Sequence, residues 1–257
     1  MSQLHSNGKP ASLFAYPPSD KPWRRWLLPI LLVAASATAL TIDGSLAQWS
    51  LHRHCPSDLR KLFQFSEPFG HGIGVLLLAL AVFQLDTLRR RAVPRLLLLS
   101  LGSGLLADLL KLTVVRFRPY HVEMAAAAPG AFGDWLPLAR VGAFAQSFPS
   151  GHAATAAGLA LGLSALYPRG RWLFVGLAVL VACQRLESDA HYLSDVLFGA
   201  AIGATVAALC LNRGALARRF DQWELPLGTA HYPLPASHSP HSSRTTRARR
   251  PAARSSS

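Results

Sequence analysis

Several long, uncharged apolar runs constrain the fold of this chain more than any other feature of its sequence. Each run is roughly 15 to 21 residues long, close to the ~20 residues with which a helix crosses the hydrocarbon core of a bilayer. The chain of 257 residues is 51% hydrophobic and only 15% charged, a balance typical of membrane proteins. The sequence therefore predicts an all-α bundle of transmembrane helices.

The apolar runs predict six helices, separated by turns and polar loops. These helices cover approximately residues 26–46, 70–85, 96–115, 149–167, 172–184 and 192–211. The fifth run is short for a span, so its helix either continues past Arg185 or lies sunk in the bundle. The expected domains are a disordered leader over 1–23, a six-transmembrane-helix domain over 24–212, and a disordered basic tail over 213–257. The first helix is expected to stay in the protein as an anchor.

Basic residues gather in the turns on one side of the predicted bundle. Arginines precede the first helix, occupy the turns at 89–95 and 169–171, and follow the sixth helix at 213–219. Because short cytoplasmic loops carry an excess of Lys and Arg, this side is predicted to be cytoplasmic, with both termini on it. The net charge of +13 then favours anionic lipid over nucleic acid as the partner of the tail. A multi-pass protein of a bacterial inner (plasma) membrane is expected.

The first of three polar clusters lies at the outer end of the third predicted helix. Lys111 and Arg118 are seven residues apart, about two helical turns, and emerge on similar faces. Two fixed cations can bind a phosphate. Lys and Arg at helix ends also commonly extend their side chains to the membrane interface without binding a ligand. Asp108 is placed to pair with Lys111, and Arg116 is a further cation without an assigned role.

The second cluster begins the fourth predicted helix with the residues Pro149-Ser150-Gly151-His152. The free N–H groups of a helix N-terminus bind anions, and Gly151 lets the backbone approach them closely. The Ser150 hydroxyl can donate to a phosphate oxygen, and His152 can supply a proton to a leaving oxygen. An ordinary capped helix with an interfacial histidine explains this tetrapeptide equally well when it is taken alone.

The third cluster begins the sixth predicted helix. His191 and Asp195 are four residues apart on one helical face, so Asp195 can orient the imidazole through one ring nitrogen and leave the other free to attack phosphorus. Arg185, one loop earlier, can neutralise charge on the transferring group. A lone His–Asp pair is more often structural, but three such clusters on one predicted outer face favour catalysis. Glu67 and His71 on the same face are either an interfacial ion pair or groups near the substrate entrance.

Together the clusters resemble the type 2 phosphatidic acid phosphatase superfamily. The family signature is Lys-x6-Arg-Pro, then Pro-Ser-Gly-His, then Ser-Arg-x5-His-x3-Asp. This chain has Lys111-x6-Arg118-Pro119, Pro149-Ser150-Gly151-His152 and Arg185-x5-His191-x3-Asp195. Gln184 stands where the family often has Ser; its amide can still donate a hydrogen bond, so the change bears on positioning rather than on the reaction.

The resemblance implies an integral membrane lipid phosphatase that acts on a phosphomonoester or diphosphate through a phosphohistidine, without a metal or other cofactor. His191 would be the nucleophile, Asp195 its orienting partner and His152 the acid for the leaving group. The residues that would hold the phosphoryl oxygens are Lys111, Arg118, Ser150, Gly151 and Arg185. The active site would lie at the outer, periplasmic or extracellular, face of the bundle.

The substrate is left open among phosphatidic acid, phosphatidylglycerol phosphate, undecaprenyl diphosphate and phosphorylated lipid A, all suggested by the resemblance. Two other functions remain open as well. A vanadate-dependent haloperoxidase-like enzyme would use similar residues to hold vanadate, but membrane embedding weighs against it. A non-hydrolytic transporter or binder of anionic lipid would use Lys111 and Arg118 to line a path, but it has no need of a His191–Asp195 pair facing His152. The oligomeric state is not indicated by the sequence.

Overall fold

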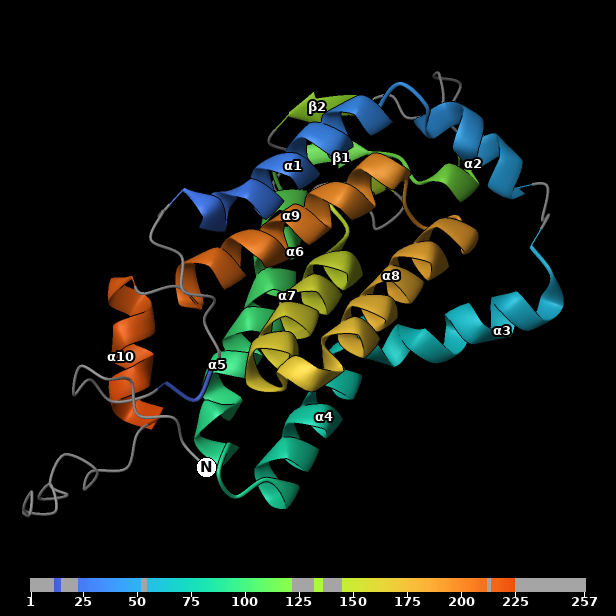
Figure 1. Ribbon diagram of the computed structural model, residues 1–257. Helices are drawn as coiled ribbons and strands as arrows, with labels where there is room; N and C mark the ends of the chain where they lie inside the picture. The colour runs from blue at the N-terminus through green and yellow to red at the C-terminus, as the bar shows by residue number, and fades with distance from the viewer. Residues whose placement is uncertain are drawn as a thin grey trace, which may run out of the picture. The chain divides into compact units, whose positions relative to one another are not determined.

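The computed structural model describes residues 12–14, 23–51, 55–121, 132–135, 145–211 and 214–224. Within these ranges the protein is predominantly helical, as the sequence predicts (Figure 1). The longer helices are α1 (Arg24–Ala39), α2 (Asp43–Leu51), α3 (Ser57–Ser66), α4 (Gly72–Leu85), α5 (Val93–Leu97), α6 (Ser103–Lys111), α7 (Gly151–Leu166), α8 (Arg171–Glu187), α9 (Leu193–Cys210) and α10 (Ala215–Glu224). Helix α10 lies within the predicted disordered tail, so the prediction of disorder is wrong for Ala215–Glu224. Most of the rest of the tail and most of the leader lie outside the described residues, where disorder stays a prediction.

Fewer helices qualify as complete spans than the six predicted. The continuous helical segment Arg90–Lys111, which includes α5 and α6, and helix α9 are each long and apolar enough to cross a membrane. Two bent pairs raise the number of candidate spans to four if each pair is one span: α1 with α2, bent by 76°, and α3 with α4, bent by 67°. The described part of the chain therefore holds two to four candidate spans.

Three helix boundaries differ from the prediction for identifiable reasons. The first predicted helix breaks near Asp43, because this carboxylate turns into the protein and becomes almost fully buried. The third begins earlier and ends at Lys111, because β1 (Val114–Arg116) pairs antiparallel with β2 (Phe132–Trp135). The fifth continues past Arg185 to Glu187, which is the first of its two predicted alternatives.

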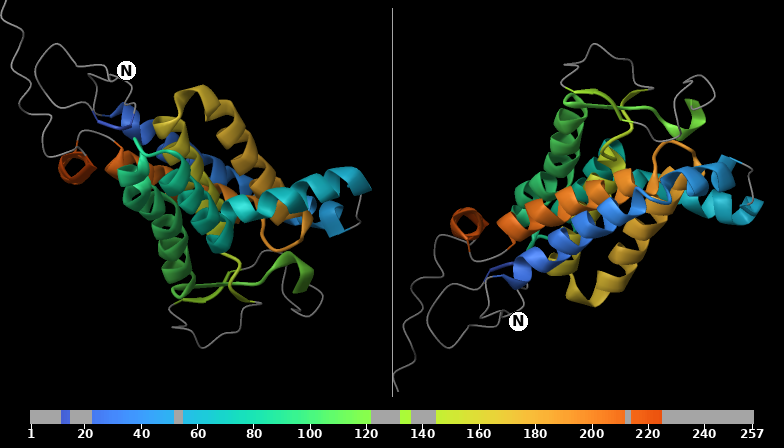
Figure 2. Two further views of the ribbon diagram at one scale, coloured as in Figure 1. Left: turned by 90° about the horizontal axis from the view of Figure 1, so that it is seen from below. Right: turned by 90° about the horizontal axis from the view of Figure 1, so that it is seen from above.

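Helix α7 forms the centre of the helical packing. Neighbouring helices α6, α8 and α9 surround it, while α1 lies along α9 (Figures 1 and 2). Small residues permit this close packing: a Cβ atom on Gly158 would lie 1.8 Å from the Leu99 carbonyl oxygen, and one on Gly199 would lie 2.3 Å from the Ser150 carbonyl oxygen. Glycine at these two positions lets the backbones meet, as is common between membrane helices.

Substituting Gly158 by Ala should destabilise the protein by about 1–3 kcal/mol, because the added methyl group collides with a backbone oxygen that has little freedom to move. Gly176→Ala in α8 is the matched control, since a Cβ atom there meets nothing within 4 Å. This second change should be neutral or stabilise by up to about 1 kcal/mol. Thermal unfolding of both variants in detergent checks the difference, and equal melting temperatures would contradict the packing argument.

Helix α10 is joined to the start of the Arg90–Lys111 segment by a buried cation. Arg95 is fully buried and lies 2.7 Å from Asp221 and 2.8 Å from Glu224, two carboxylates of α10. The Ser12 hydroxyl also donates to Asp221, at 2.7 Å. Two carboxylates thus share one buried guanidinium, and burial raises the pKa of Glu224 from 4.5 to about 7.

The attachment of α10 should therefore weaken as the pH rises. Because the folded protein holds the proton of Glu224 more tightly than the unfolded chain does, its contribution to stability is complete below pH 4.5 and is lost as the pH rises through about 7. Glu224→Gln should remove this dependence, since an amide does not titrate in this range. Melting temperatures of the two proteins between about pH 5 and about pH 8 test this; parallel curves would show that Glu224 is not responsible.

Candidate active site

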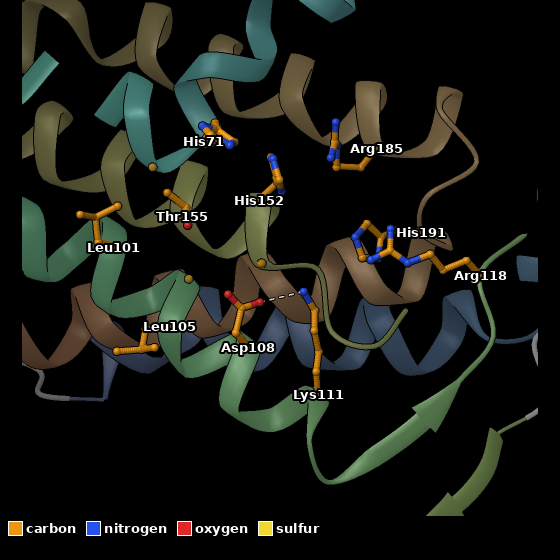
Figure 3. A pocket seen from close by; sticks show the side chains of 14 residues that line it. His71, Leu101, Leu105, Asp108, Lys111, Arg118, His152, Thr155, Arg185 and His191 are labelled. Carbon is orange, nitrogen blue, oxygen red and sulfur yellow. Dashed lines mark hydrogen bonds and ion pairs between the residues drawn. The ribbon is translucent and has the colours of Figure 1, made fainter. Parts of the chain in front are cut away.

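A cavity of about 420 Å³ brings members of all three sequence clusters together (Figure 3). Its wall is formed by residues of α4, α6, α7 and α8 and of the segments that join them. The lining side chains include Lys111 and Arg118 from the first cluster, His152 from the second, and Arg185 and His191 from the third. Leu101 and Leu105 form an apolar part of the same wall. A charged pocket with three histidines, His71, His152 and His191, therefore adjoins an apolar surface.

His191 is held by a backbone carbonyl rather than directly by Asp195. Its Nδ1 lies 2.7 Å from the Ser147 carbonyl oxygen, whereas the nearest Asp195 carboxylate oxygen is 3.8 Å away, too far for a hydrogen bond. Asp195 therefore lies beside the ring nitrogen at ion-pair distance, while the hydrogen-bond partner of Nδ1 is the Ser147 carbonyl oxygen. With Nδ1–H donating to Ser147, Nε2 carries the lone pair, which suits a nucleophile on the cavity wall.

Burial favours the neutral form of the His191 imidazole. It lowers the pKa of His191 below its ordinary value, although the neighbouring Asp195 carboxylate acts in the opposite direction. Arg118 and Lys111, which share the cavity with His191, lower this pKa further. A neutral imidazole at neutral pH has the lone pair that attack on phosphorus requires.

Asp195 lies behind the cavity and organises the residues around His191. It is fully buried near the start of α9. Its carboxylate accepts hydrogen bonds from the Ser147 hydroxyl at 2.6 Å, from the Tyr192 backbone N–H at 2.9 Å and from Arg116. Asp195 therefore fixes both Ser147, whose carbonyl orients His191, and the chain next to His191.

Arg116 and Asp43 form an internal support that sequence reasoning missed. The Arg116 guanidinium is 1% exposed; it pairs with Asp43 at 2.7 Å and with Asp195, and it donates to the Ser194 hydroxyl at 2.7 Å. The ring centroid of Tyr192 lies 4.3 Å from the guanidinium carbon. One signal for this support was present in the sequence: Asp43 is a carboxylate inside an otherwise apolar run, and such residues are usually functional.

The three predicted phosphate-binding cations have different partners. Lys111 Nζ lies 2.8 Å from Asp108, as predicted. Arg185 donates from Nη2 to Glu67 at 2.8 Å and from Nε to the Gln184 side-chain oxygen, so Gln184 acts here as an acceptor. Within the described ranges, the buried Nε of Arg118 has no hydrogen-bond partner. Arg118 is thus the cation least committed to protein partners.

The turn before α4 contributes two more groups to the site. Glu67, which pairs with Arg185, also lies 3.9 Å from His152 Nε2. His71 caps α4 through its side chain and lies beside His152, with ring centroids 5.7 Å apart. His71 thus lines the cavity, and Glu67 lies close to two residues that line it, Arg185 and His152.

Ser150 and Gly151 occupy the start of α7 in different ways. The Ser150 side chain is buried and accepts a 3.4 Å hydrogen bond from the Ala153 N–H as the helix cap; it does not line the cavity. Gly151 does line it, and a Cβ atom there would lie 2.9 Å from an Asp108 carboxylate oxygen. Phosphate binding by the Ser150 hydroxyl therefore stays a prediction. No group of three His, Cys, Asp or Glu side chains in the described part of the chain is arranged to hold a metal ion.

Comparisons with known proteins agree with these motifs. Residues 92–219 match the family described as the PAP2 superfamily. The Lipid A 1-phosphatase of Rhizobium johnstonii is 39% identical over 107 residues, which are 42% of this chain and 41% of that protein. The Lipid A 1-phosphatase of Rhizobium etli is 38% identical over 107 residues, again 42% of this chain and 44% of that protein. The alignments thus span less than half the length of these relatives.

A solved structure was also found to be similar. It is the crystal structure of a transmembrane PAP2 type phosphatidylglycerolphosphate phosphatase from Bacillus subtilis, with a TM-score of 0.49 and 20% sequence identity over 79% of this chain and 97% of that chain. The family match covers the Arg118, His152 and His191 motifs, and so confirms the resemblance that the sequence indicated. The chain belongs to the PAP2 superfamily.

Proposed function

We propose that this chain is an integral membrane lipid phosphatase that hydrolyses a phosphomonoester or diphosphate of an amphiphilic lipid through a phosphohistidine, without a metal. The observation that carries the proposal is one cavity lined by the two motif histidines, His152 and His191, and by the cations Lys111, Arg118 and Arg185. The relatives that are Lipid A 1-phosphatases support a phosphorylated lipid as the class of substrate.

In the proposed reaction, Lys111, Arg118 and Arg185 hold the phosphoryl oxygens and stabilise the charge that develops on them. The lone pair of His191 Nε2 attacks phosphorus while the bond to the leaving oxygen breaks, and His152 gives that oxygen its proton. Water then attacks the phosphohistidine as neutral His152 takes its proton, and the P–N bond breaks with its electron pair returning to His191 Nε2. Inorganic phosphate departs, and both histidines return to their starting states.

The setting of the cavity suits an amphiphile. Leu101 and Leu105 line it beside the charged groups, and the exposed fractions of Leu105 and Leu109 on α6 are 61% and 53%. Such exposure fits a helix that contacts lipid tails. We propose that six membrane-embedded helices place the cavity at the outer face with both termini in the cytoplasm, a topology supported by the basic turns on the opposite side of the predicted bundle.

Phosphate release from a panel of phosphorylated lipids tests the proposal. The purified protein in detergent, with EDTA present, should release phosphate from at least one of phosphatidic acid, phosphatidylglycerol phosphate, undecaprenyl diphosphate and phosphorylated lipid A. Loss of all activity on adding EDTA would contradict the metal-free mechanism. Transfer of intact lipid between the leaflets of liposomes, with no phosphate released from any substrate, would instead support a transporter.

A further inference from the structure

Glu67 stands in the active site although it lies outside residues 92–219, the part of the chain that matches the family. It begins the turn η1 (Glu67–Gly70), which connects α3 to α4. Its carboxylate oxygen Oε1 lies 2.8 Å from Arg185 Nη2 and 3.9 Å from His152 Nε2. One carboxylate thus faces both a phosphate-binding cation and the proposed acid.

The surroundings of His152 otherwise oppose a positive charge on its ring. Groups that are cationic or can become so face the cavity from each neighbouring element: Lys111 from α6, Arg118 after β1, Arg185 from α8, His191 before α9 and His71 at the start of α4. Positive charges on these neighbouring groups disfavour the imidazolium form of His152. Asp108, the carboxylate among the residues that line the cavity, is paired with Lys111 at 2.8 Å. Glu67 is therefore the carboxylate placed to favour protonated His152.

We propose that Glu67 is a positioning residue that keeps His152 protonated until the leaving group departs; this inference rests on the proposed phosphatase function. In the structure Arg185 holds the Glu67 carboxylate at 2.8 Å. When a substrate phosphate takes over Arg185, the freed charge of the Glu67 carboxylate, 3.9 Å from His152 Nε2, favours the imidazolium form of His152, while the Nε2–H itself stays directed to the leaving oxygen. The buried Nε2 has no hydrogen-bond partner among the described residues, so its N–H is available to the leaving oxygen.

The interaction of Glu67 with His152 affects one step in particular, the breaking of the bond between phosphorus and the leaving oxygen. As the P–O bond breaks, its electron pair goes to the leaving oxygen, which takes the proton from His152 Nε2 while the N–P bond to His191 forms. A strongly basic alkoxide needs this proton in order to leave, whereas a nitrophenolate leaves readily without it. The contribution of Glu67 to the rate should therefore depend on the leaving group. A purely structural role would affect both kinds of substrate equally.

The experiment compares the full-length wild-type protein with Glu67→Gln, His152→Gln and Glu187→Gln. Each is assayed on a long-chain alkyl phosphate and on a nitrophenyl phosphate carrying the same chain. Glu187 is the matched control because it is also an arginine-paired glutamate, 2.6 Å from Arg60, and does not line the cavity. The nitrophenyl substrate reports whether each variant is folded and still binds phosphate.

Glu67→Gln should lower kcat on the alkyl phosphate by about 100-fold, and on the nitrophenyl phosphate by less than about threefold. The high-pH limb of its alkyl phosphate profile should move to lower pH by about one unit, because the imidazolium loses its carboxylate partner. His152→Gln should show the same selectivity, and Glu187→Gln should leave both rates unchanged. Glu67→Asp, which keeps the charge, should recover part of the lost rate.

Equal losses on both substrates in Glu67→Gln, or an unmoved pH profile, would overturn the inference. If His152→Gln is selective for leaving group and Glu67→Gln is not, the phosphatase mechanism stands and the role of Glu67 is wrong. If the wild-type protein releases no phosphate from these substrates or from the lipid panel, the proposed function itself fails.

Discussion

His191→Asn should reduce phosphate release by about 10⁴-fold or more, because it removes the proposed nucleophile. Asparagine suits this test because its side-chain amide can still donate to the Ser147 carbonyl oxygen, the group that holds His191 Nδ1 at 2.7 Å. The local structure should therefore persist while the attacking Nε2 atom is lost. Initial rates on the preferred lipid measure the effect.

Trapping of the phosphorylated enzyme separates a lost nucleophile from a damaged site. Rapid quenching of wild-type protein with radiolabelled lipid should recover an acid-labile, alkali-stable phosphoryl group, and His191→Asn should recover none. Asp195→Asn is the comparison variant: because Asp195 is 3.8 Å from the ring nitrogen, it should lose rate yet still form the labelled intermediate. Labelling of His191→Asn at the wild-type level would show that another residue is the nucleophile.

Arg116→Met should destabilise the protein by about 3–5 kcal/mol, the largest effect on stability that we expect from a single substitution here. The change leaves two carboxylates, Asp43 and Asp195, buried without the cation that lies between them. Their exposed fractions are 2% and 0%, so bulk solvent does not reach them. Chemical denaturation in mild detergent measures the free energy of unfolding.

Arg60→Met serves as the matched control for Arg116→Met. Arg60 also forms a close ion pair, 2.6 Å from Glu187, but its side chain is 30% exposed, so its loss should cost less than about 1 kcal/mol. Adding Asp43→Asn to Arg116→Met should restore part of the stability, because it removes one of the unpaired charges. Equal destabilisation by the two arginine substitutions would show that burial of the Arg116 ion pairs does not determine the loss in free energy of unfolding.

Spacing within short motifs was sufficient to predict most of the residues that meet in the cavity. Lys111, Arg118, His152, Arg185 and His191 were named from the sequence, and all five line one pocket. The Lys111–Asp108 pair was also predicted correctly, because residues three apart on a helix are neighbours. These predictions depend on the spacing of residues along the chain, which is the same whatever the tertiary arrangement.

Contacts between distant segments could not be predicted in the same way. The sequence indicated that Asp195 would hold the His191 ring directly, but the Ser147 carbonyl, 44 positions earlier, lies closer to it. The support of Asp195 by Arg116 and Asp43 joins three elements that are far apart in the chain. Nothing in the pattern of any one segment specifies such a partner, because it depends on how the helices approach one another.

The sequence by itself determined the helical, apolar character of the protein, the motifs of its family and the main residues of its site. Apolar runs and motif spacing are local properties, and they carry that information directly. Only the tertiary structure decided three features of the site. The helix before Asp43 is bent so that Asp43 is buried, Arg116 at the end of β1 pairs with Asp195, and Glu67 lies near His152. The physical reason is that a buried charge is stable only where packing supplies its partner, and packing is a property of the whole fold.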